Sequence, residues 1–197
     1  HPNGHRLDMG QAVQFMRDRL PADTIICNGA GNFAGWWHRY WRYEGFPTQL
    51  APTCGAMGYG VPAAVAATLR HPDRTVVAVA GDGDFLMNGQ ELATAAQHGA
   101  QMIVIVVDNS AYGTIRMHQE REFPGEDRIS ATRLANPDFA ALAEAYGAWS
   151  ARAATTDEFK DALVAAQGRS GLRLIHCTID IEQLAASGAS VSGLRGA

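Results

Sequence analysis

The residues of this chain that are best suited to chemistry follow two short apolar runs. Asp82 comes two residues after the run Thr75–Ala80, and Asn109 comes two residues after the run Met102–Val107. A carboxylate and an amide both offer hard oxygen ligands. A site with only a few protein oxygens suits Mg²⁺, because this ion keeps several waters and shares phosphate oxygens with a substrate. Gly83 lets the backbone approach a phosphate closely, and N–H groups at the start of a following helix favour an anion. This pattern predicts a site for a divalent metal and a diphosphate.

The elements that must position these side chains are predicted to be buried strands. Continuous valine-rich runs are typical of strands covered on both faces. Strands alternate with helical segments, which favours a three-layer α/β fold with a mainly parallel sheet and helices on both faces. If the strands before Asp82 and Asn109 are neighbours, about 4.8 Å apart, the two residues meet at one edge of the sheet. Strands are expected at 24–27, 75–80, 102–107 and 172–178, and helices at 8–20, 61–69, 90–98, 136–146 and 155–167.

The composition suits one globular domain and excludes several classes of function. The 197 residues are 47% hydrophobic and 18% charged, which allows a sizeable core. The net charge is −4, and without a long basic run this disfavours binding to nucleic acid or to an anionic membrane. No apolar stretch reaches the ~18–20 residues of a membrane-spanning helix. Cys27, Cys54 and Cys177 form no CxxC pair, so we expect small buried residues in a cytoplasmic protein.

The ends of the chain are expected to differ from its centre. The chain opens on His1 rather than methionine and shows no signal-peptide pattern, so we expect a piece of a longer protein. Residues 1–186 are expected to form one domain. Residues 187–197 are small and polar, and are expected to form a flexible tail.

Three segments together resemble the thiamine-diphosphate-dependent enzymes. Gly81-Asp82-Gly83, with Asp108-Asn109 downstream, is similar to the signature of that family, which is Gly-Asp-Gly followed by Asn-Asn. Segments 55–64 and 90–95 resemble those of acetolactate synthases. The three-part signature is specific, whereas Gly-Asp-Gly alone is an ordinary strand-to-helix turn. The resemblance implies the C-terminal thiamine-diphosphate-binding domain of an acetolactate synthase-like enzyme.

The resemblance implies roles at the two strand ends. Asp82, the Asn109 side chain and the Ala111 carbonyl would hold Mg²⁺. The backbone N–H groups of Gly83 and Asp84 would bind the diphosphate. The site would therefore hold the diphosphate end of the cofactor through one metal ion.

The resemblance also implies how the cofactor is bent for reaction. Met57 would be the wedge beneath it, with the Gly55 carbonyl and the Met57 N–H facing the pyrimidine. The pyrimidine amine, as its imine tautomer, would then remove the C2 proton of the thiazolium, and the cofactor would supply the electron sink for decarboxylation of a 2-oxo acid. The complete implied set of cofactor-binding residues is Gly31, Asn32, Gly55, Ala56, Met57, Gly81, Asp82, Gly83, Asp84, Asn109, Ala111, Tyr112, Gly113 and Thr114.

Four features depart from the family pattern. Asp108 stands where the first Asn is usual, and is expected to bind N–H groups of its own loop while adding a negative charge beside the metal site. The loop 29–32 lacks the Gln-His pair of many acetolactate synthases. Ile115 stands where pyruvate decarboxylases carry a catalytic Glu, which argues against that activity. His118 stands where acetolactate synthases carry a Trp that selects the second substrate. Ile115 and His118 are the candidate substrate-pocket residues.

The resemblance also implies a partner domain. In this family the carboxylate that activates the pyrimidine comes from a separate amino-terminal domain, usually of a second subunit. No segment of the 197 residues resembles that domain, so no catalytic residue is assigned to this chain. We expect the isolated chain not to turn over substrate, and the intact enzyme to be a homodimer or homotetramer.

Other functions stay open from the sequence. Within the family, a lyase or oxidase similar to benzoylformate decarboxylase is the alternative. A cofactor-binding module without catalysis is another. The segment 29–34 also fits the dinucleotide fingerprint G-x-G-x-x-A, but the acidic residue expected about 20 residues later is missing, since 48–50 reads Thr-Gln-Leu.

Overall fold

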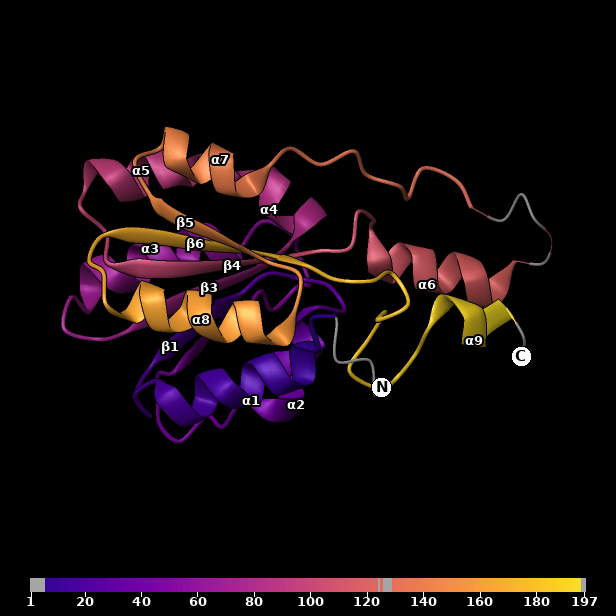
Figure 1. The fold of residues 1–197 in the computed structure, drawn as a ribbon, viewed down its shortest axis with the longest axis horizontal. Coiled ribbons are helices and arrows are strands. Elements are labelled where there is room, and N and C mark those ends of the chain that lie inside the picture. The colour runs from indigo at the N-terminus through magenta and orange to yellow at the C-terminus, as the bar shows by residue number, and fades with distance from the viewer. Residues whose placement is uncertain (1–5, 124, 126–128, 196–197) are drawn as a thin grey trace.

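The fold is built on one parallel sheet. The computed structural model of the protein describes residues 6–123, 125 and 129–195. The strands lie in the order β2-β1-β3-β4-β6-β5, and every neighbouring pair is parallel (Figure 1). They are β1 (Ile25–Asn28), β2 (Gln49–Leu50), β3 (Val76–Gly81), β4 (Met102–Asp108), β5 (Trp149–Ala153) and β6 (Leu172–Thr178).

Helices cover both faces of the sheet and confirm the three-layer α/β prediction. One hydrophobic cluster joins the sheet to α1 (Met9–Arg19), α2 (Ala34–Tyr40) and α8 (Thr156–Gln167). A second joins the other face to α3 (Gly60–Arg70), α4 (Asp82–Asn88), α5 (Leu92–Gln97) and α7 (Phe139–Ala145). Helices α6 (Gly113–Glu122) and α9 (Val191–Arg195) lie side by side beyond the edge where β3 and β4 end (Figure 1).

The central strands place the two candidate ligands next to each other. Every residue of β3 and β4 is buried, as expected for valine-rich strands between two helical layers. Gly81, the last residue of β3, pairs with Val107 near the end of β4. The strands before Asp82 and Asn109 are therefore neighbours, as the sequence predicts.

Some elements of the structure differ from the sequence prediction or are additional to it. The helix predicted at 90–98 is a 3₁₀ turn, Gly89–Glu91, followed by α5, and a separate helix α4 starts directly after β3. The edge strand β5 is mostly only half-buried, so it lacks the apolar run that marks β3 and β4. A capping box between Thr155 and Glu158 starts α8.

Two expectations about the surface of the molecule need revision. The segment 187–197, predicted as a flexible tail, contains helix α9, whose Arg195 pairs with Glu120 of α6. The cysteines were expected to be buried, and Cys27 and Cys177 are, but Cys54 is exposed in the loop before α3. None of the described helices is long and apolar enough to cross a membrane.

Candidate functional site

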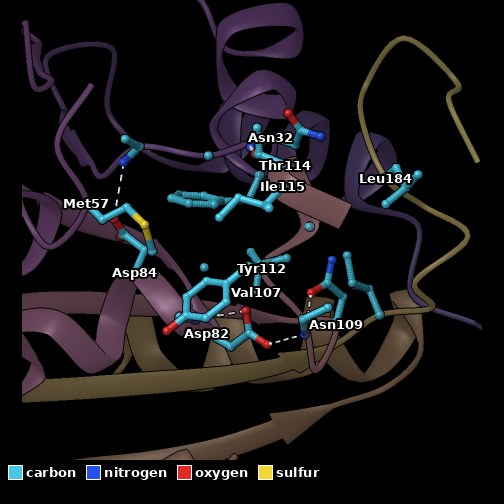
Figure 2. A pocket seen from close by; sticks show the side chains of 18 of the residues that line it. Asn32, Met57, Asp82, Asp84, Val107, Asn109, Tyr112, Thr114, Ile115 and Leu184 are labelled. Carbon is cyan, nitrogen blue, oxygen red and sulfur yellow. Dashed lines mark hydrogen bonds between the residues drawn. The ribbon is translucent and has the colours of Figure 1, made fainter. Parts of the chain in front are cut away.

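A pocket opens where β3 and β4 end (Figure 2). Its volume, including space open to solvent, is about 810 Å³. One part of its wall is polar and comes from the loops after the central strands. The other part is apolar and comes from α2, α6 and the segment after β6. The lining residues are Ala30, Gly31, Asn32, Phe33, Trp36, Gly55, Met57, Gly81, Asp82, Gly83, Asp84, Val107, Asn109, Ala111, Tyr112, Gly113, Thr114, Ile115, Ile179, Gln183 and Leu184.

Asp82 and Asn109 converge in this pocket. The Ala111 N–H donates to Asp82 Oδ2 and to Asn109 Oδ1, at 3.1 Å in each case (Figure 2). Asp82 Oδ1 accepts a further hydrogen bond from the Gly83 N–H at 2.9 Å. The structure thus brings together the carboxylate, the amide and the backbone of the residue whose carbonyl is the third implied ligand.

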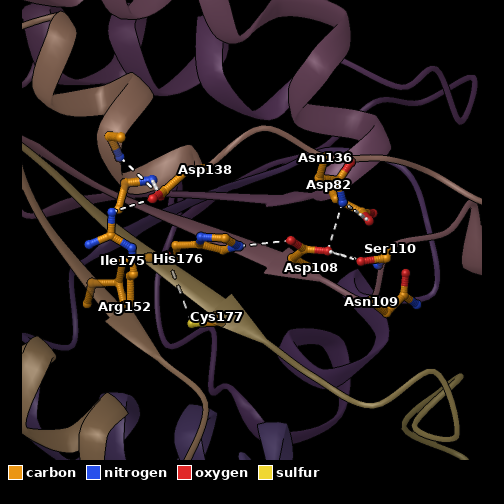
Figure 3. A network of polar contacts seen from close by, with 12 residues as sticks. Asp82, Asp108, Asn109, Ser110, Asn136, Asp138, Arg152, Ile175, His176 and Cys177 are labelled. Carbon is orange, nitrogen blue, oxygen red and sulfur yellow. Dashed lines mark hydrogen bonds and ion pairs between the residues drawn. The ribbon is translucent and has the colours of Figure 1, made fainter.

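A polar network extends from Asp82 to β6 (Figure 3). Asn136 Nδ2 donates to Asp82 Oδ2 and to Asp108 Oδ1, at 2.8 Å each. Asp108 Oδ2 lies 2.9 Å from His176 Nε2, and Asp108 Oδ1 accepts from the Ser110 N–H at 2.8 Å. Asp108 therefore does bind an N–H group of its own loop, as expected from the sequence. The same carboxylate also links the candidate metal ligand to a histidine.

The two carboxyl groups of this network have opposite pKa shifts. Burial raises the pKa of Asp82 to about 6, against hydrogen bonds from Asn136 and Gly83 that lower it, and the charge of Asp108 raises it further. Burial also acts to raise the pKa of Asp108, but hydrogen bonds from His176, Ser110 and Asn136 bring it below its ordinary value. Asp108 is thus held ionised beside Asp82, and this negative charge favours a cation.

Asp84 forms a second polar centre, on the other side of Gly83. Its Oδ1 accepts hydrogen bonds from the Gly58 N–H at 2.9 Å and from the Ala30 N–H at 3.2 Å. Burial raises the pKa of Asp84 to about 6, while these two bonds lower it. The side chain of Asp84 therefore contacts both the loop of Ala30 and the loop of Gly58, which are far apart in sequence.

The turn that carries Met57 is shaped by its glycines. Gly55 and Gly58 adopt φ values of 68° and 83°, in the left-handed region that favours glycine. A side chain at Gly58 would also lie 2.7 Å from Cβ of Met87. The turn places Met57 in the pocket wall next to Asp84 (Figure 2).

The structure gathers most of the predicted site residues, with two exceptions. Ala56 is exposed and does not line the pocket, although it lies in the turn between two residues that do. His118 is exposed on α6 and contacts Arg121 through its Nδ1 at 2.8 Å, outside the pocket lining. Ile115 lines the pocket and is 51% exposed.

Several residues of the site were missed from the sequence. Asn136 and His176 were interpreted as parts of a helix start and a strand, because residues so distant in sequence from Asp82 give no local signal. The apolar side chains of Phe33 and Leu184 in the pocket wall were missed for the same reason. The only local signal was the sequence Asn136-Pro137-Asp138, which is typical of a fixed turn.

The residues present fit a magnesium-bound diphosphate. The set of a carboxylate, an amide and a carbonyl consists of hard oxygen donors, which Mg²⁺ prefers. The hydrogen bonds to Asp82 come from neutral backbone and amide groups, so its charge lacks a cationic partner among these donors. Within the described residues no cluster of three His, Cys, Asp or Glu side chains forms a metal site.

Comparison with known proteins identifies relatives of this chain. Residues 29–177 match the family described as "Thiamine pyrophosphate enzyme, C-terminal TPP binding domain". The large subunit of acetolactate synthase isozyme 2 from Escherichia coli K12 is 35% identical over 172 residues, which are 85% of this chain and 31% of that protein. A 3D-(3,5/4)-trihydroxycyclohexane-1,2-dione hydrolase from Bacillus velezensis is 34% identical over 182 residues, 89% of this chain and 28% of that protein.

A solved structure has the same fold. The thiamine diphosphate-dependent 4-hydroxybenzoylformate decarboxylase of Rhodococcus jostii RHA1 superposes with a TM-score of 0.83 and 28% identity, over 91% of this chain and 34% of that one. This chain spans about a third of the length of these relatives. With the family match over 29–177, these findings show that the chain belongs to the thiamine pyrophosphate enzymes, as their C-terminal cofactor-binding domain.

Proposed function

We propose that the pocket binds thiamine diphosphate through Mg²⁺. Asp82, the Asn109 side chain and the Ala111 carbonyl hold the metal, and the backbone N–H groups of Gly83 and Asp84 hold the diphosphate. The observation that carries this proposal is the convergence of Asp82 and Asn109 on the Ala111 N–H, in the wall of one pocket. Asp82 Oδ1 accepts one hydrogen bond and keeps a lone pair for a metal, whereas Oδ2 accepts two.

The chain's own residues hold and shape the site. Met57, fixed by the turn between Gly55 and Gly58, presents its side chain to the pocket beside Asp84. Phe33 and Trp36 make part of the wall apolar, which excludes water from the reacting end. When bound, thiamine diphosphate supplies an electron sink for carbanion chemistry. The activating carboxylate is expected from a partner domain.

We further propose that the reaction is decarboxylation of a 2-oxo acid, with transfer or release of the aldehyde unit. Two of the relatives support this: an acetolactate synthase at 35% identity and a 4-hydroxybenzoylformate decarboxylase with the same fold. Ile115 in the pocket wall favours a small or apolar donor side chain. The alternative is a lyase or oxidase of the same family. His118 stands where acetolactate synthases carry the Trp that selects the second substrate, and its position outside the pocket lining is compatible with this alternative.

Calorimetry tests the binding step. Thiamine diphosphate is titrated into the protein with Mg²⁺, and again with a chelator in place of the metal. We expect binding with Mg²⁺ that is strongly weakened by the chelator. Equal affinity with and without metal, or binding of NAD in place of thiamine diphosphate, would contradict the proposal.

The reaction class requires a second assay. The protein is combined with its amino-terminal partner domain and offered a panel of 2-oxo acids, with the products identified. Acetohydroxy acids as products support the transferase, whereas free aldehydes support the lyase. Turnover by the 197 residues alone would refute the expected dependence on a partner carboxylate.

A further inference from the structure

Asp84 connects segments that are far apart in sequence. Its carboxylate accepts from Ala30, 54 residues away, and from Gly58, 26 residues away. The first lies in the loop after β1, and the second directly follows Met57. Asp84 itself belongs to α4, one residue after Gly83. One side chain thus joins three segments that all line the pocket.

The packing around Asp84 leaves room for this arrangement and for little else. Asp84 is 3% exposed, and its Oδ2 is buried without a hydrogen-bond partner among the described residues. A Cβ at Gly29 would lie 2.0 Å from that oxygen. Glycine at position 29 is therefore required for the carboxylate to occupy its place beneath the loop.

A carboxylate in this place needs an explanation. Burying a charged group without a charged partner is unfavourable, and the two backbone N–H groups offset only part of that cost. A small apolar residue would fill the position without it. The contacts to both loops suggest that the carboxylate is kept for their alignment.

We propose that Asp84 is a positioning residue, whose side chain aligns the Met57 turn and the loop of Gly29 and Ala30 with the diphosphate site. This inference rests on the proposed function, because the alignment matters when a cofactor spans the distance from Met57 to Asp82. It assigns the side chain of Asp84 a role separate from that of its backbone N–H.

Two variants of Asp84 test the proposal. Asp84→Ala removes both hydrogen bonds, and we expect its affinity for thiamine diphosphate with Mg²⁺ to fall about 10–100-fold, the usual loss for a supporting partner of a metal site. Asp84→Asn keeps an oxygen that accepts both N–H groups, so it should recover most of the affinity. Asp138→Ala is the matched control: Asp138 also accepts two backbone N–H groups, those of Ala140 and Ala141, but lies outside the pocket.

A third variant tests the contact with Gly29. Gly29→Ala displaces the carboxylate, so we expect a loss of affinity similar to that of Asp84→Ala. In the Asp84→Ala background the same substitution should cost much less, because the oxygen it meets is gone. Additive losses in the double variant would contradict the proposal.

Amide hydrogen exchange gives a readout that needs no cofactor. We expect the Ala30 and Gly58 amides to exchange slowly in the wild type, and faster in Asp84→Ala but not in Asp138→Ala. Fast exchange at both amides in the wild type would overturn the inference, even if the alanine variant fails to fold. So would wild-type affinity in a folded Asp84→Ala, or an equal loss in Asp138→Ala. If the wild type shows slow exchange at both amides but binds no thiamine diphosphate, the proposed function fails while the link made by Asp84 stands.

Discussion

Asp82 and Glu120 are two buried carboxylates in opposite settings. They are 3% and 2% exposed. Glu120 accepts charged hydrogen bonds from Arg116 at 2.7 Å and from Arg195 at 2.8 Å, and the bond from Arg195 contributes most to holding its pKa below the ordinary value. Asp82 accepts from neutral groups beside an ionised Asp108, and burial raises its pKa.

This difference separates a carboxylate with charged partners from the one that we propose to bind the metal. The charge of Glu120 is compensated by arginines on α6 and α9, so it holds these two helices together. The described residues that donate to Asp82 are neutral. A cation that enters the pocket therefore interacts more favourably with Asp82 than with a carboxylate already paired with arginines. Substitution of each carboxylate in turn tests this difference.

The largest effect is expected from Asp82→Asn. The amide keeps the size of the side chain but removes the charge that binds the metal. We expect Mg²⁺-dependent affinity for thiamine diphosphate to fall by more than the ~10–100-fold typical of supporting residues. Calorimetry at pH 7 measures it, and unchanged affinity would show that the metal is held elsewhere.

A smaller loss of affinity is expected from Asn136→Ala. Asn136 donates to both Asp82 and Asp108, so without it the Asp82 carboxylate loses a hydrogen bond that fixes its orientation toward the metal. The loss of Mg²⁺ affinity should be about 10–100-fold. A titration with Mn²⁺ followed by electron paramagnetic resonance measures it. An affinity equal to that of the wild type would show that Asn136 does not support metal binding.

Glu120→Gln should lower stability rather than affinity. The two arginines lose a buried charged partner, and the free energy of unfolding should fall by about 1–3 kcal/mol. Urea denaturation measures the fall. The comparison with Asp82 would fail if Glu120→Gln lost as much Mg²⁺ affinity as Asp82→Asn.

The smallest effect is a difference in pH dependence in the absence of metal. The pKa of Asp82 is raised from 3.8 to about 6, so its contribution to the free energy of unfolding decreases as pH rises from about 4 to about 6. The pKa of Glu120 is lowered from 4.5, so its contribution is lost as pH falls below about 4.5. Asp82→Asn should flatten the first slope and Glu120→Gln the second. Unfolding curves at several pH values test this, and the same slope in all three proteins would contradict it.

The sequence predicts that Asp82 and Asn109 lie close together because both follow the strongest pattern in the chain. The runs ending at Ala80 and Val107 are apolar throughout, and adjacent parallel strands bring their carboxyl ends to one edge. Asp82 and Asn109 therefore meet by topology alone. The family signature then suggests which of these residues bind the metal and the diphosphate in the proposed site.

The parts that the sequence did not predict depend on tertiary contacts. Helix α6 buries only Arg116 and Glu120, so it shows no apolar face to read, and its partner α9 lies in a segment of small polar residues. Asn136 reaches Asp82 across 54 residues. The side chain of Asp84 contacts two loops whose proximity no local pattern expresses.

Diffraction from crystals of the protein with thiamine diphosphate and Mn²⁺ tests the central claim most directly, because anomalous scattering locates the ion. We predict one ion bound by the Asp82 carboxylate, the Asn109 amide oxygen and the Ala111 carbonyl, with the diphosphate on the same ion. An ion located away from Asp82, or a diphosphate bound without any ion, would contradict the account.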